Sequence, residues 1–94
     1  MIKELNPLIH SQLRLSIMTI LCAVDQADFN YLKQETRATA GNLSVQLDKL
    51  NQAEYIEIKK EFVGKKAHTI CRITPIGHRA FEEYTQTLKK MLNL

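Results

Sequence analysis

The 94-residue sequence has no tryptophan and is poor in turn-forming residues, with three glycines and two prolines. A β sandwich or barrel needs frequent turns, so this composition argues against an all-β fold and favours helices. A chain of this length buries somewhat over ~60% of its unfolded surface, which suits one modest core. We therefore expect one domain over residues 1–94.

Cysteine is also scarce, with Cys22 and Cys71 both in apolar runs. No neighbouring residue marks either thiol as reactive, so we expect small core residues in a reducing compartment, with redox sensing as the alternative. No uncharged apolar run approaches the ~20 residues of a membrane span. The first ten residues, MIKELNPLIH, lack the layout of a signal peptide. The sequence thus predicts a cytoplasmic protein without a membrane partner.

Motifs for metal binding and catalysis are missing. His10, His68, His78 and the two cysteines form no C-x-x-C or H-x-x-x-H spacing. We predict no metal site and no cofactor, although a two-residue site shared across a dimer stays open. No G-x-S-x-G, P-loop or dinucleotide fingerprint appears, so we do not expect an enzyme. His68 is expected near DNA, and His10 and His78 at the surface or in caps.

A first helix is predicted from Pro7 to Val24, with Asn6 as N-cap and Pro7 at the first helical position. Its apolar residues fall on two sides, so we expect one side to pack on the domain and the other to face a second chain. The first side comprises Leu13, Ile17, Ile20, Leu21 and Val24, and the second comprises Leu15, Met18 and Cys22.

Two short helices are predicted next. Asp28 can cap a helix that ends near Thr36, and after the break RATAG, Thr39 can cap a helix that runs to about Ala53. Two helices joined by so tight a break, over residues 28–53, are typical of a helix-turn-helix.

From Tyr55 the apolar period changes to two, which predicts a β hairpin over about residues 55–73 with a turn around Gly64. Closing it at Phe62 and Ala67 places Ile58 opposite Cys71 and Ile56 opposite Ile73. The same register places Glu57 opposite Arg72, an opposite-charge pair worth about 0.2–1 kcal/mol.

The last helix is predicted over about residues 75–92, with Thr74 as N-cap and Pro75 at its first position. Its apolar stripe and the apolar C-terminus are hard to bury in one small domain, so we expect a homodimer. The predicted dimer-interface residues are Leu5, Leu8, Leu15, Tyr84, Leu88, Met91 and Leu92.

The order of helix, helix, helix, hairpin and helix is that of a winged helix-turn-helix, a mainly α fold with a two-stranded wing. The segments GNLSVQLDKL and YIEIKKEFVGKKAHTICRITPIGHRAFEEY resemble the small winged-helix transcriptional regulators of the MarR/ArsR broad group, and a compact MarR-like subfamily within it. The resemblance covers Pro7 to Tyr84. It implies a homodimer that binds a pseudo-palindromic operator, with the third helix in the major groove and the wing on the backbone or in the minor groove.

The third helix carries its leucines on one side and short residues on the other. Gly41, Val45 and Asp48 lie opposite the leucines, flanked by Asn42 and Lys49, with Ser44 and Gln46 on the edges. We interpret Gly41 as allowing close backbone approach to a groove, where Asn42 or Gln46 can pair with adenine and Val45 can meet a thymine methyl. A simple capped helix start is the alternative, and the carboxylate of Asp48 argues against phosphate.

The predicted wing is basic, with five Lys or Arg against one Glu between Lys59 and Arg72, a net +4 in a chain of net +3. We therefore predict a DNA-binding transcriptional regulator, expected to act as a repressor, with double-stranded DNA and a second copy of itself as partners. A winged helix that binds protein instead is the alternative, and a small-molecule effector stays open. The predicted DNA-binding residues are Thr39, Gly41, Asn42, Ser44, Val45, Gln46, Lys49, Lys65, Lys66 and His68.

Overall fold

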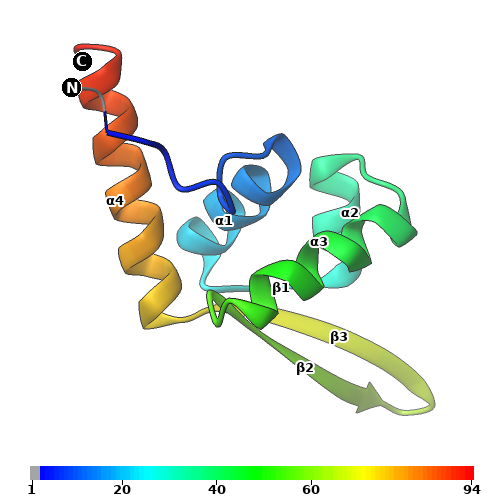
Figure 1. Cartoon of the computed structure of the whole chain (residues 1–94). Coiled ribbons are helices and arrows are strands. Elements are labelled where there is room, and N and C mark those ends of the chain that lie inside the picture. Colours follow the sequence, from blue (N-terminus) through cyan, green and yellow to red (C-terminus); the bar gives the residue numbers. More distant parts are fainter. Residues whose placement is uncertain (1–2) are drawn as a thin grey trace.

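Figure 1 shows the computed structural model, which describes residues 3–94. Helices α1 to α3 gather beside a small sheet, while α4 and the tip of the β2–β3 hairpin point away from them (Figure 1). The order confirms the predicted winged helix fold. The elements are α1 (Gln12–Val24), β1 (Gln26–Asp28), α2 (Phe29–Thr36), α3 (Ala40–Gln52), β2 (Ile56–Val63), β3 (Lys66–Ile73) and α4 (Pro75–Met91).

The core lies where α1, α2 and α3 meet the base of the sheet. The predicted stripe of Leu43, Leu47 and Leu50 on α3 is buried, which leaves the opposite side of that helix to solvent. Burial of each such leucine stabilises the fold by about 1.5–3 kcal/mol. The other core residues are Ile17, Met18, Leu21, Ala27, Leu32, Ile56, Cys71 and Ile73.

The hairpin register is the predicted one, with Ile58 opposite Cys71 and Glu57 opposite Arg72. A third strand was not predicted: β1 pairs antiparallel with β3, giving the sheet order β1-β3-β2. The guanidinium of Arg72 donates to Gln26 Oε1 at 2.7 Å on this new strand. The expected opposite-charge pair with Glu57 is absent from the ion pairs of residues 3–94.

Three helices begin at the predicted capping residues. The side chains of Asp28, Thr39 and Thr74 each accept a hydrogen bond from the backbone N–H three residues later. Each cap satisfies a donor that the helix leaves unpaired, and is worth about 1 kcal/mol. These caps fix where α2, α3 and α4 start.

The predicted start of the first helix was wrong. Helix α1 begins at Gln12 with Ser11 as N-cap, and Asn6 instead caps a separate turn, where its Oδ1 accepts from Leu8 N at 2.9 Å. His10 N also donates to the Asn6 carbonyl at 2.8 Å, which closes the turn before the helix starts. Met18, expected on the side facing a second chain, is fully buried in this one, and Val24 is exposed.

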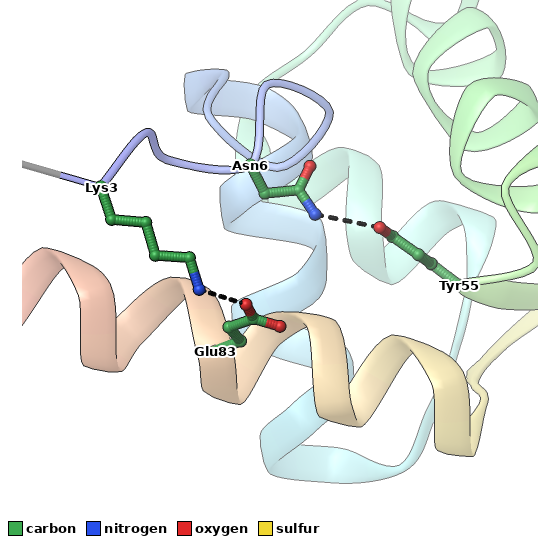
Figure 2. A network of polar contacts seen from close by, with 4 residues as sticks. All are labelled: Lys3, Asn6, Tyr55 and Glu83. Atoms are coloured by element: carbon green, nitrogen blue, oxygen red, sulfur yellow. Dashed lines mark hydrogen bonds and ion pairs between the residues drawn. The ribbon is translucent and has the colours of Figure 1, made fainter.

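The N-terminal segment packs between α4 and the base of the wing (Figure 2). Lys3 Nζ lies 2.6 Å from Glu83 Oε1, and Asn6 Nδ2 donates to the Tyr55 hydroxyl at 2.9 Å. The ion pair with Lys3 lowers the pKa of Glu83 below its usual value. The segment therefore joins α4 to the start of β2.

Candidate nucleic-acid interface

The N-terminal half of α3 presents an exposed surface made of short side chains. Gly41, Asn42 and Ser44 are exposed, and Val45 is 50% exposed although it is apolar. A Cβ added to Gly41 would meet no atom within 4 Å, so no neighbour in this chain requires a glycine there. The space beside Gly41 is therefore open to a second molecule.

A polar network within the chain already engages two of the residues predicted to contact DNA on this surface. The guanidinium of Arg14 on α1 donates to Gln46 Oε1, and Gln46 Nε2 donates to Asn42 Oδ1 at 3.0 Å. Gln46 is half-buried, and both ends of its amide are bonded to residues of the same chain. Thr39, also predicted to contact DNA, uses its hydroxyl to cap α3 at Asn42 N, 3.2 Å away.

The wing presents lysines around an apolar tip. Lys65 and Lys66 are exposed at the turn, where Gly64 has a positive φ of 66° that glycine adopts at little cost. Phe62 and Val63 precede the turn and are 75% and 65% exposed, which the sequence reading did not single out.

The remaining predicted contact residues lie on both elements. Lys49 is exposed on α3, and so is Asp48, which forms no ion pair within residues 3–94. His68 is half-buried on β3, directly opposite Glu61 in the hairpin register. Lys59 lies 3.5 Å from the same glutamate, so one wing lysine is partly neutralised within the wing.

The predicted dimer-interface residues divide into three groups. Tyr84 is 3% exposed, with its hydroxyl 2.9 Å from His10 Nδ1, so it packs inside the chain and offers almost no surface to a partner, contrary to expectation. Met91 and Leu92 are 40% and 57% exposed. The half-buried residues are Leu5, Leu8, Leu15 and Leu88, of which Leu8 packs against the core.

The two thiols differ in their surroundings. Burial raises the pKa of the Cys71 thiol to about 11, so this cysteine is an unreactive core residue. Cys22 Sγ lies 3.8 Å from His78 Nδ1, a pair that could not be predicted because the two residues are far apart in the sequence.

Across residues 3–94, no three His, Cys, Asp or Glu side chains come together as metal ligands. In the same part of the chain, no helix is both long and apolar enough to cross a membrane.

A family model described as a winged helix DNA-binding domain matches residues 13–92. The chain belongs to this family. The match spans α1 to the end of α4, so it includes the helix-turn-helix, the wing and the last helix together.

One relative resembles this winged helix domain in sequence, and two solved structures resemble it in fold. An uncharacterized protein of Methanocaldococcus jannaschii is 36% identical over 75 residues, which cover 80% of this chain and 82% of that protein. A transcriptional regulator homologue from Pyrococcus horikoshii has a TM-score of 0.85 at 22% identity, covering 92% of this chain and 85% of that one. A mutant of E. coli MarR in complex with operator DNA has a TM-score of 0.73 at 18% identity, covering 89% of this chain and 58% of that one. The resemblance to MarR-type regulators inferred from the sequence is thus confirmed for the fold.

Arg14 is the polar residue that sequence reasoning missed. It is the only Lys, Arg, Asp or Glu among residues 5–24, a stretch rich in apolar residues. A lone cation on such a helix requires a partner when it is half-buried, and this was the available signal. The partners, Gln46 and the Leu8 carbonyl, come from two other segments and could not be assigned from spacing.

Proposed function

We propose that this winged helix domain binds double-stranded DNA and regulates transcription, with α3 in the major groove and the wing along the backbone. The observation that carries the proposal is the open space beside Gly41, where the exposed side of the first turn of α3 has only short side chains. The same small fold also exposes lysines on its wing. Lysines neutralise phosphates, and an unobstructed helix terminus can approach a groove closely. The operator complex of the MarR mutant supports this arrangement by its fold.

We further propose that the protein acts as a homodimeric repressor in the cytoplasm. Helix α4 extends away from the other helices (Figure 1). It ends at the exposed Met91, which is followed by the exposed Leu92 and by Leu94, 88% exposed. The chain measures 54 × 25 × 21 Å, and its Cα radius of gyration of 14.1 Å exceeds the roughly 12 Å of a compact domain this size. A second copy packed on the end of α4 would cover this apolar surface.

The dimer is tested by sedimentation of the wild type and of Leu92→Glu. We expect a dimer for the wild type and a monomer for Leu92→Glu, because a carboxylate in an apolar interface is strongly unfavourable. Gln86→Glu makes a charge-matched control, since it adds the same single negative charge at an exposed position of the same helix. A monomeric wild type at high concentration would contradict the homodimer.

DNA binding is tested by fluorescence anisotropy on a labelled random-sequence duplex between about 50 and about 200 mM salt. Phosphate contact predicts affinity that falls steeply with salt. An absence of binding at the lowest salt would contradict the proposal.

A protein-binding role is the second candidate, and two observations favour it. Phe62 and Val63 form an exposed apolar tip on the wing, and the exposed Asp48 on α3 repels phosphate. A protein partner would accept both features. The anisotropy experiment separates the two roles, because a protein-binding module needs no salt-dependent affinity for random DNA.

A further inference from the structure

The polar network on α3 fixes the direction of a side chain at the proposed DNA surface. Arg14 reaches from α1, and its guanidinium donates both to the Leu8 carbonyl and to Gln46 Oε1. Gln46 lies one helical turn after Asn42 and donates to its Oδ1 at 3.0 Å. Asn42 is the exposed end of this Arg14–Gln46–Asn42 relay.

The chemistry of the three groups leaves one arrangement. The two ends of an amide look alike in shape, so orientation has to be deduced from partners. A guanidinium has only donors, so the Gln46 atom that faces Arg14 has to be its oxygen. The Gln46 amino group then faces Asn42 and requires an oxygen there. The amino group of Asn42, with two N–H donors, is consequently left on the far side of its amide.

We propose that Arg14, acting through Gln46, sets Asn42 to present hydrogen-bond donors to the DNA. This inference rests on the proposed function. The major-groove edge of guanine, with its O6 and N7 acceptors, suits such a group. Adenine presents only one acceptor, N7, beside its N6 donor, so it matches an outward amino group less well than guanine, while Asn42 Oδ1 is held toward Gln46. Asn42 therefore favours guanine over the adenine pairing that asparagine usually forms, and Arg14 is a positioning residue.

A single substitution reverses the relay. In Gln46→Glu the introduced carboxylate still pairs with Arg14, but it has no N–H for Asn42. The Asn42 amide then turns to donate to that carboxylate, and its oxygen faces outward. The preferred base should change from guanine to one that offers a donor, adenine or cytosine. A good bidentate base contact corresponds to about a 5- to 150-fold change in relative preference, and the amino group acting alone should give a change near the lower end of that range.

The experiment selects binding sites from a random-sequence duplex pool with the wild-type chain and its variants. Gln52→Glu is the charge-matched control, because it adds the same charge at the exposed end of α3 without contacting Asn42. Asn42→Asp removes the donors and should abolish the guanine preference at the same base pair. Arg14→Met should make that position less selective, and Arg14→Lys, which keeps a donor for Gln46, should restore part of it.

The outcomes test the relay separately from the proposed DNA binding. Changed preference at one base pair in Gln46→Glu, with Gln52→Glu like the wild type, supports the relay. If the wild type selects a site and Gln46→Glu selects the same one, the relay is refuted while DNA binding stands. A loss of affinity in Asn42→Asp that is equal for all sequences places the acceptor on a phosphate and refutes base contact. A wild type that selects no sequence and binds no duplex overturns both proposals.

Discussion

Removing the two lysines at the wing turn is the most direct test of how this domain would bind DNA. Lys65 and Lys66 are both exposed, so Lys65→Ala with Lys66→Ala should change the free energy of unfolding by less than about 0.5 kcal/mol. Any loss of DNA affinity then reports on binding and not on folding. The loss should be similar for all DNA sequences, because phosphates carry no sequence information.

The expected magnitude follows from the number of exposed cations. Lys49 on α3 and Lys60, Lys65 and Lys66 on the wing can each neutralise one phosphate, whereas Lys59 is paired with Glu61. A dimer would then neutralise about eight phosphates, for a log–log salt slope of about −7. The double variant loses half of these contacts, so its slope should be about −3.6. Between about 50 and 200 mM salt, affinity should fall by about 2 × 10⁴-fold for the wild type and about 150-fold for the variant.

The assay is fluorescence anisotropy on one labelled duplex at several salt concentrations. Lys89→Ala with Lys90→Ala is the matched control, since it removes the same charge from the last turn of α4, away from the wing. We expect the control to retain the wild-type slope. If the wing variant keeps a slope near −7, or if only its sequence preference changes, the wing does not hold phosphates and the reasoning is refuted.

Three further predictions concern single residues. Gly41→Leu should weaken DNA binding at least about tenfold in the same anisotropy assay, because its side chain fills the open space at the start of α3, while the melting temperature stays near that of the wild type. Gly77→Ala should lower the free energy of unfolding in urea by about 3 kcal/mol, because its Cβ would lie 2.1 Å from the Tyr55 carbonyl oxygen and two backbone segments would have to separate. Burial raises the pKa of the Cys71 thiol from 9.0 to about 11, so above pH 9 unfolding releases a proton that the folded chain keeps. The free energy of unfolding of the wild type should thus fall between pH 9 and 11 by up to about 2.7 kcal/mol more than that of Cys71→Ala, and parallel pH profiles would contradict this.

The features that sequence predicted well depend on neighbouring residues. Asp28, Thr39 and Thr74 cap their helices through contacts three residues away, so local spacing suffices to recognise them. The hairpin register was predictable because a shift of one residue would expose Ile56 and Ile58 while burying charge.

The features that it missed depend on distant partners. Strand β1 has three residues, too few for an alternating pattern, and it exists only because β3 offers an edge to pair with. At the N-terminus, Asn6 is a good cap by local spacing, but it forms a turn that ends at His10, and α1 starts after Ser11, whose side chain makes no capping hydrogen bond. The engagement of Gln46 by Arg14 was hidden for the same reason, because 32 residues separate them.

The structure also suggests how a dimer formed through α4 would set the positions of its two DNA-contacting surfaces. Tyr55 lies between α3 and the first residue of β2, and it is held by α3, by the N-cap of α4 and by the N-terminal segment. Its N–H donates to the Leu50 carbonyl at 3.0 Å, its own carbonyl accepts from Thr74 N at 3.0 Å, and Asn6 binds its hydroxyl at 2.9 Å. Gly77 packs so closely on the same carbonyl that even a Cβ has no room. A rotation of α4 against a partner would therefore move α3 and the wing with it as one body. The spacing of the two third helices, about 34 Å for adjacent half-sites, would then be set at the dimer interface and not by bending within the chain.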